Sequence, residues 1–176
     1  MSYVKQTTRD LAMAGLMLAA GLVLHFVCPA IVAGMRPDFS LIMLILFVLL
    51  RRERKITIAA GIATGIITAM TTTFPGGQIA NVIDKVLTTF LLLGFSMLPE
   101  GYFNTIVTSI VGTIFSGTVF LTSAFLIVGL PTTFKALFIS VVLPAAALNT
   151  IAIVLLYPLA IKLNNSLSPQ KSGVRL

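Results

Sequence analysis

The 176-residue chain is poor in the side chains on which most catalytic and metal sites depend. It has one cysteine, one histidine and five acidic residues. A single cysteine excludes an internal disulfide framework and a thiolate metal site. Hydrolases and metalloenzymes need clusters of acids and histidines. We therefore expect no catalytic residues, no bound metal and no cofactor.

Charged residues are scarce as well, at 10% of the chain, whereas hydrophobic residues make up 57%. An ordinary soluble domain carries about 25% charged residues, so this chain cannot cover a water-facing surface. The mean hydropathy of +1.06 also excludes intrinsic disorder, which needs low apolar content. An integral membrane protein of one domain remains.

Six apolar segments are candidates for helices that cross the bilayer, each of which needs about 20 mostly apolar residues. The expected spans are residues 11–27, 39–50, 56–74, 79–98, 102–130 and 135–161, with proline and glycine at their joints. The second is short, and we expect Arg51 and Arg52 to extend to the membrane interface. The sequence thus predicts an all-α membrane protein with six transmembrane helices.

The basic residues are unevenly distributed about these spans. With six crossings, nine lysines and arginines fall on one side and two on the other. Cytoplasmic loops carry excess Lys and Arg, so we expect both termini in the cytoplasm. This bias, rather than nucleic-acid binding, explains the net charge of +7. Residues 1–163 are expected to form one transmembrane domain, and 164–176 a polar cytoplasmic tail.

Two charged residues, Asp84 and Lys85, lie inside the otherwise apolar fourth span. Ionised side chains are costly within a bilayer, so they usually face a cavity or a partner. On a helix, Asn81, Asp84, Lys85 and Thr88 share one stripe. The stripe is either part of a solute-binding site or a structural contact that joins two helices.

Further polar residues lie in the first outer loop and in the fifth and sixth spans. In Gly34-Met35-Arg36-Pro37-Asp38, Arg36 is suited to a carboxylate. Asp38 is suited either to an ammonium group or to the N-terminal end of the next helix. Asn149 follows Pro144-Ala145-Ala146-Ala147 and is suited to helix packing. Small and hydroxyl residues on one stripe of the fifth span, Thr113 and Ser116 among them, form a packing seam that could border a polar cavity.

Gly15 and Ala19 form a small-xxx-small pair in the first span, which allows another helix to approach closely, in the same chain or in a partner. No P-loop motif of the form Gly-x-x-x-x-Gly-Lys-Ser/Thr occurs. The chain therefore has no visible means of hydrolysing a nucleotide.

Taken together, these segments resemble the bacterial tryptophan-transport proteins, a group of substrate-capturing S components of energy-coupling-factor (ECF) transporters. The resemblance extends to about Lys162. It is carried by Gly15-Leu16-Met17-Leu18-Ala19-Ala20 with His25, Gly34-Met35-Arg36-Pro37-Asp38, Thr72-Thr73-Phe74-Pro75-Gly76-Gly77-Gln78-Ile79 with Asn81 and Ile83-Asp84-Lys85, Ile127-Val128-Gly129-Leu130-Pro131, and Val142-Leu143-Pro144-Ala145-Ala146-Ala147 with Asn149.

The resemblance implies a six-helix subunit of the bacterial cell membrane that binds its solute near the outer face. It also implies docking of the first helix on a transmembrane coupling subunit that carries two ATPases. In the family's usual Ala-x-x-x-Ala docking motif, Gly15 replaces the first alanine and Ala19 is the second.

A tryptophan site needs partners for a carboxylate, an ammonium and an indole. Arg36 and Lys85 are candidates to bind the carboxylate, and Asp38 and Asp84 are candidates to bind the ammonium. Gln78 and Asn81 are candidates to bond the indole N–H, and the rings of Phe39, Phe74 and Phe120 are candidates to pack against the indole. Asn149 is a further site candidate. These groups would suit other amphiphilic zwitterions equally well. Two alternatives remain: a self-sufficient transporter in which Asp84 and Lys85 couple transport to protons, and a structural membrane protein.

Overall fold

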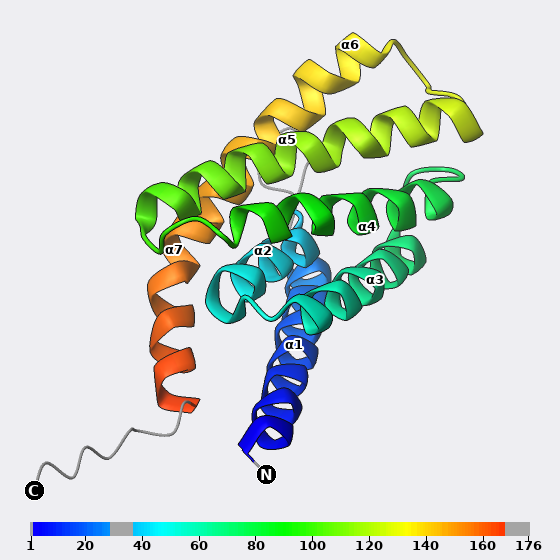
Figure 1. The fold of residues 1–176 in the computed structure, drawn as a ribbon. Coiled ribbons are helices and arrows are strands. Elements are labelled where there is room, and N and C mark those ends of the chain that lie inside the picture. The colour runs from blue at the N-terminus through cyan, green and yellow to red at the C-terminus, as the bar shows by residue number, and fades with distance from the viewer. Residues whose placement is uncertain (1, 29–36, 168–176) are drawn as a thin grey trace, which may run out of the picture.

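The computed structural model describes residues 2–28 and 37–167, and the regular structure in these ranges is entirely helical (Figure 1). The elements are α1 (Ser2–Val27), α2 (Phe39–Arg51), α3 (Arg54–Thr71), α4 (Gln78–Phe95), α5 (Tyr102–Ile127), α6 (Phe134–Leu137), the π-helical turn η1 (Phe138–Val142) and α7 (Leu143–Leu167). Because α6, η1 and α7 follow one another without a break, the described chain forms six helical segments. The predicted all-α class is confirmed.

Four segments are long and apolar enough to cross a membrane. They are Thr7–Val27, Gln78–Phe95, Tyr102–Ile127 and Phe134–Lys162. Each overlaps one of the spans expected from the sequence. The other two segments are α2, which is apolar but has only 13 residues, and α3.

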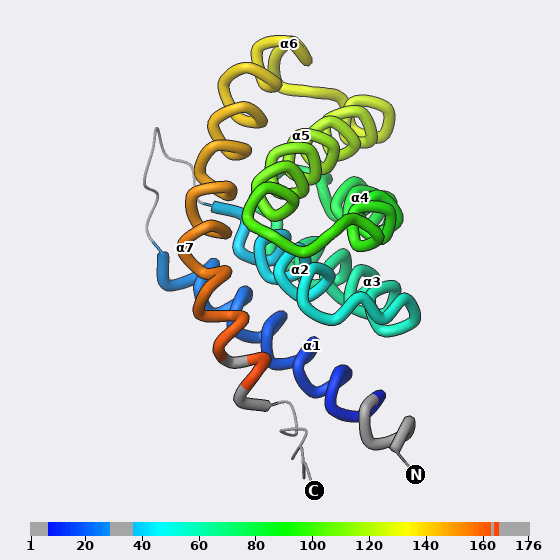
Figure 2. The backbone as a smooth tube through the Cα atoms, turned by 60° about the vertical axis from the view of Figure 1, so that its left-hand side comes forward, coloured from blue at the N-terminus to red at the C-terminus, as the bar shows by residue number. Residues whose placement is uncertain are grey.

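The short helix α2 forms the centre of the molecule. Its residues from Phe39 to Leu49 are all buried, and it contacts α1, α3, α4, α5 and α7 (Figures 1 and 2). A helix that is apolar on every side is stable only when it is covered on every side. Its length of about 20 Å, at 1.5 Å per residue, therefore suits a core helix surrounded by longer ones.

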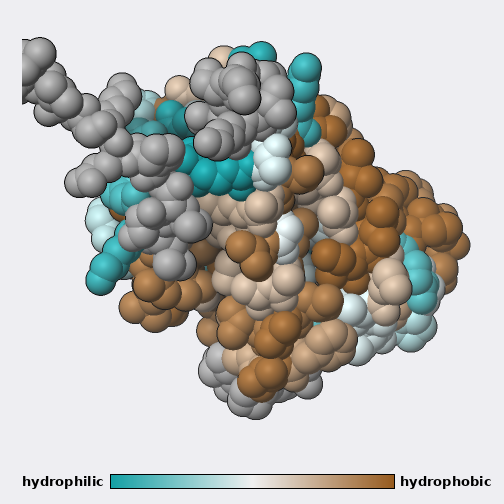
Figure 3. Space-filling model, turned by 90° about the horizontal axis from the view of Figure 1, so that it is seen from below, coloured by the Kyte–Doolittle hydropathy of each residue, from teal (hydrophilic) through white to brown (hydrophobic). Residues whose placement is uncertain are grey.

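The polarity of the surrounding helices is inverted relative to a soluble protein. Large apolar residues such as Ile66, Phe90 and Phe103 are exposed, whereas threonines and serines such as Thr64, Thr108 and Ser109 are buried. Apolar side chains cover much of the face shown in Figure 3. Such an exterior is suited to lipid rather than water.

Helices α3 and α4 pack almost backbone to backbone. A Cβ atom at Gly61 would overlap the side chain of Thr89, and one at Gly65 would lie 3.2 Å from the Cα atom of Val82. Gly61 and Gly65 have the GxxxG spacing that permits close approach of membrane helices. This contact fixes α4, and with it Asp84 and Lys85, against the rest of the bundle.

The π-helical turn η1 ends two residues before Pro144. Proline lacks an N–H group, and its ring clashes with the carbonyl four residues earlier in a regular α-helix. A π turn at this point accommodates the proline without ending the helix. The last helical segment therefore continues to Asn149 and beyond.

Arg51, at the end of α2, does not extend outward. Its side chain is 6% exposed, and its guanidinium lies 3.3 Å from the carboxylate of Asp10 on α1. Its Nε–H also donates to the sulfur of Met13. The expected extension to the interface is thus replaced by an ion pair within the bundle.

Candidate functional site

A polar cavity of about 250 Å³ lies between α2, α4, α5 and the last helical segment. Small-molecule sites in proteins typically measure about 300–1,000 Å³, so this cavity is close to the lower end of that range. Its polar lining includes Asp38, Asp84, Lys85, Thr113, Ser116 and Asn149, and its apolar lining includes Phe74, Phe120 and Val142. The cavity brings together residues that are more than 100 positions apart in the sequence.

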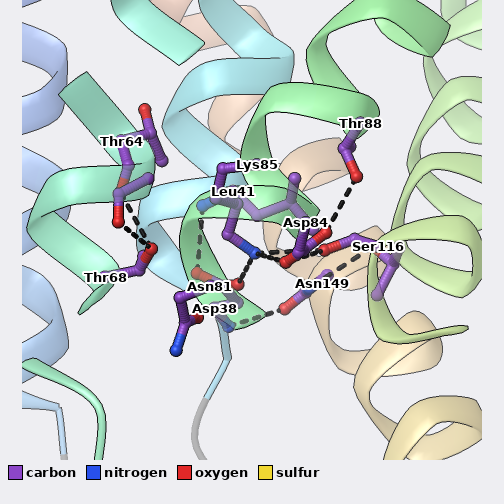
Figure 4. Close-up of polar contacts among 12 residues, drawn as sticks. Asp38, Leu41, Thr64, Thr68, Asn81, Asp84, Lys85, Thr88, Ser116 and Asn149 are labelled. Atoms are coloured by element: carbon purple, nitrogen blue, oxygen red, sulfur yellow. Dashed lines mark hydrogen bonds and ion pairs between the residues drawn. The ribbon is translucent and has the colours of Figure 1, made fainter. Parts of the chain in front are cut away.

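Lys85 is the centre of the polar lining (Figure 4). Its ammonium donates to Asp38 at 2.9 Å, to Asp84 at 2.7 Å and to the hydroxyl of Ser116 at 3.0 Å. The lysine side chain is only 3% exposed. Buried charges are tolerated when they are paired and hydrogen-bonded, and this lysine satisfies both conditions.

Asp84 completes the buried part of this cluster. One carboxylate oxygen accepts from Lys85 and from the Ser116 hydroxyl at 2.9 Å, and the other accepts from Thr88 at 2.9 Å. Thr88 lies one helical turn beyond Asp84 on α4, as the predicted stripe requires. The carboxylate is 2% exposed, so the surrounding protein rather than water solvates it.

Asp38 caps α2, as its position suggested, and its second carboxylate oxygen pairs with Lys85. Its Oδ1 accepts from the backbone N–H of Leu41 at 3.0 Å, which caps α2, while Oδ2 accepts from Lys85. Burial alone would raise the pKa of the Asp38 carboxyl, but the Lys85 ammonium and the Leu41 N–H outweigh it and hold the pKa below its ordinary value. These contacts favour the ionised form of the carboxylate.

Asn149 ties the last helical segment to the start of α2. Its side-chain oxygen accepts from the backbone N–H of Asp38 at 2.9 Å, and its Nδ2 donates to Thr113 on α5 at 3.3 Å. Asn149 is fully buried. It therefore holds the backbone of Asp38 in position, whereas Lys85 contacts the Asp38 carboxylate.

The remaining candidates from the sequence lie in different places. Asn81 lines the cavity and donates to the backbone carbonyl of Gly77. Gln78 is exposed at the start of α4 and is not among the residues that line the cavity. Arg36 lies outside the described residues.

Two aromatic side chains form part of the cavity wall. Phe74, before α4, and Phe120, on α5, meet edge to face with their ring centroids 5.4 Å apart. Phe39, the third aromatic candidate, is buried in the core instead. Aromatic walls of this kind suit a flat ring that packs edge to face or offset.

A second cavity, of about 420 Å³, lies between α1, α2 and α7. Leucine, methionine and alanine side chains line it, among them Leu16, Met17 and Leu156. None of its lining residues carries a charge or a side-chain hydrogen-bonding group of the kind that a zwitterion needs. The smaller polar cavity is therefore the better candidate for a polar solute.

The small-residue pair on α1 faces outward. Gly15 and Ala19 are both exposed, and a Cβ atom at Gly15 would meet no atom within 4 Å. The pair is therefore not used to pack helices within the described part of the chain.

A buried ionised cluster that lines a cavity in an apolar helical bundle is typical of membrane proteins that bind or move polar solutes. Comparison with known families identifies the group. The model of the family described as tryptophan transporter TrpP matches residues 7–164. The chain belongs to this family, and it is a multi-pass protein of the bacterial plasma membrane.

Curated relatives bear the name probable tryptophan transport protein. The relative from Clostridium acetobutylicum is 47% identical over 152 residues, which cover 84% of this chain and 89% of the relative. The relative from Bacillus subtilis is 46% identical over 155 residues, covering 86% and 90%. The relative from Clostridium perfringens is 40% identical over 167 residues, covering 88% and 92%. No solved structure matches the chain.

Proposed function

We propose that the protein is the substrate-binding S subunit of an ECF-type importer of tryptophan, and that the polar cavity is its substrate site. The observation that carries this proposal is the cluster of Asp38, Asp84 and Lys85 in the cavity wall. Membrane-embedded ionisable residues are expensive and are therefore functional candidates by default. Family membership supports tryptophan as the solute.

The cavity offers groups suited to the indole and to the ammonium of tryptophan. Phe74 and Phe120 provide an aromatic wall for the indole. Carboxylates in the lining are suited to the ammonium, and Asn81 is suited to the indole N–H. A few placed polar groups in an otherwise apolar cavity fix the orientation of a ligand and give specificity.

The proposal includes six crossings with both termini in the cytoplasm. The ion pair between Asp10 and Arg51 places the end of α2 beside the first half of α1. The beginning of α1 and the end of α7 lie at the same end of the molecule (Figures 1 and 2). The four basic residues within 51–55 then belong to that cytoplasmic end. A green fluorescent protein fused to the C-terminus should fluoresce, and a fused alkaline phosphatase should be inactive; the reverse result would contradict this topology.

We assign the exposed pair Gly15 and Ala19 to docking on the coupling subunit. Because no described residue lies within 4 Å of a Cβ atom at Gly15, a larger residue there should not disturb the subunit itself. Gly15→Leu combined with Ala19→Leu should abolish co-purification with the coupling subunit while tryptophan binding persists. Val23→Leu, at another exposed position of α1, is the matched control and should co-purify normally. Normal co-purification of the double variant would contradict the docking assignment.

The substrate assignment can be tested with the ligand's own fluorescence, because the chain contains no tryptophan. Purified protein in detergent is titrated with L-tryptophan under selective indole excitation. We expect a saturable blue shift that an excess of a non-fluorescent tryptophan analogue reduces and thiamine does not. No saturable shift, either alone or with the coupling module present, would refute tryptophan as the solute.

Reconstitution distinguishes an S subunit from a self-sufficient ion-coupled transporter. Proteoliposomes that contain this chain alone should bind tryptophan without accumulating it under a proton gradient. Accumulation should require the coupling subunit, its ATPases and ATP. Gradient-driven accumulation by this chain alone would favour the ion-coupled alternative.

A further inference from the structure

The cavity contains a lysine that cannot accept a further ligand without losing a bond it already makes. A lysine ammonium has three N–H donors, and those of Lys85 are directed to Asp38, Asp84 and Ser116. An incoming carboxylate would have to displace one of these acceptors. Lys85 is therefore engaged within the protein and is not poised to bind a solute anion.

The charges of the described lining also favour an ammonium over a carboxylate as the ligand group. Among the lining residues that the structure describes, Asp38 and Asp84 contribute two negative charges, and Lys85 contributes one positive charge. With all three groups ionised, the described part of the lining thus has an excess of one negative charge. In a low-dielectric cavity this excess attracts an ammonium and repels a carboxylate.

The two carboxylates differ in their capacity for a ligand. A carboxylate has about four acceptor positions. Asp84 accepts three hydrogen bonds and is 2% exposed. Asp38 accepts two and is 34% exposed. Asp38 therefore has both the open acceptor positions and the access that an incoming ammonium needs.

We infer that Asp38 binds the ammonium group of the solute, and that the cavity selects arylalkylamines rather than aryl acids. This inference rests on the proposed function for the indole part of the solute. It removes Lys85 from the candidates for the carboxylate, and it makes Asp84 a partner of Lys85 rather than of the ligand.

Three fluorescent ligands test the inference on the unmodified protein: L-tryptophan, tryptamine, which lacks the carboxylate, and indole-3-propionate, which lacks the ammonium. Tryptamine should bind within about tenfold of L-tryptophan. Indole-3-propionate should bind more weakly by a factor of about 10 to 150, the value of one hydrogen bond to a charged group.

The substitution Asp38→Asn tests the contribution of the Asp38 carboxylate to ligand binding. Asparagine is also a good N-cap, so α2 should keep its start. The dissociation constants of L-tryptophan and tryptamine should rise by about 10- to 150-fold, while that of indole-3-propionate should stay the same or fall. Glu100→Gln, which removes a carboxylate that is 74% exposed and outside the cavity, is the matched control and should change none of the three constants.

The outcomes separate this inference from the proposed function. Tight binding of indole-3-propionate with no binding of tryptamine would overturn the inference. If L-tryptophan still bound in that case, the proposed function would stand. Equal weakening of all three ligands by Asp38→Asn would also overturn it, since that result indicates a structural role. Asp38-dependent binding of tryptamine without binding of L-tryptophan would support the inference and refute tryptophan as the solute. Failure of all three ligands would overturn both.

Discussion

Replacing Lys85 with methionine should destabilise the protein more than almost any other single change. Methionine has a similar length but no charge, so Asp38 and Asp84 would face each other in the cavity wall without a cation. Lys85 is 3% exposed and makes three hydrogen bonds. Removing one partner of a buried ion pair typically costs about 3–5 kcal/mol, and we expect a loss of this size in the free energy of unfolding.

A double substitution shows whether the loss arises from unpaired charge. Asp84→Asn alone should cost about 1–3 kcal/mol, because Lys85 keeps Asp38 as a partner. The combination of Asp84→Asn with Lys85→Met should be no less stable than Lys85→Met alone, since one of the two unpaired carboxylates is gone. The two substitutions would then be coupled by about 1–3 kcal/mol.

The free energies can be measured by reversible unfolding in mixed micelles with increasing dodecyl sulfate, followed by circular dichroism. Lys55→Met, at an exposed position at the start of α3, is the control and should change the stability by less than about 0.5 kcal/mol. The account would be contradicted if Lys85→Met lost no more free energy of unfolding than the control. It would also be contradicted if the losses of the two single cavity variants summed to that of the double variant within about 0.5 kcal/mol. In either case the cluster does not hold these helices together as described.

The other predictions concern the helix contacts and the cavity wall. Gly61→Leu should prevent the close packing of α3 on α4 and abolish folded expression, because no space exists for a side chain there. Gly94→Leu should express normally, because a Cβ atom there would have no described neighbour within 4 Å. Equal expression of the two variants would contradict the contact. Phe120→Ala should weaken L-tryptophan binding by about 5- to 50-fold through loss of ring contact. Phe125→Ala, at an exposed position on the same helix, should bind L-tryptophan as tightly as the unmodified protein. If Phe120→Ala also left L-tryptophan binding unchanged, the aromatic wall would not be part of the binding site.

The sequence identified the unusual residues of α4 but not their partners. Asp84 and Lys85 are conspicuous because charge is costly inside an apolar span. Their contacts with Asp38 and Ser116 join positions 47 and 31 residues away from Lys85, and no local pattern reports such distances. The hydroxyl stripe of α5, interpreted as a seam beside a cavity, does contribute Thr113 and Ser116 to the cavity wall.

Of the two contacts that the Asp38 carboxylate makes, only one could be predicted from the sequence. Position before an apolar helix indicates a cap, and position in an outer loop indicates ligand contact. The structure shows the cap and, from the other carboxylate oxygen, an ion pair that neither pattern indicates. Arg36 remains a candidate for the carboxylate of the solute from the sequence alone.

The short length of α2 reflects its place in the core of the bundle. A segment of this length is too short to span a bilayer upright, and the sequence suggested that flanking arginines would compensate. In the structure α2 is instead enclosed by other helices, and Arg51 is paired with Asp10. The GxxxG pair Gly61 and Gly65 was a signal that the sequence did contain, and it marks the tightest helix contact near the cavity.

An experimental structure of the protein with 5-bromo-L-tryptophan bound would test the central claim most directly, because anomalous scattering from bromine locates the ring. Our account predicts the bromoindole against Phe74 and Phe120, with the ligand's ammonium within hydrogen-bonding distance of Asp38. Bromine in the apolar cavity between α1 and α7, or a bound ligand whose carboxylate replaces Asp38 at Lys85, would contradict it.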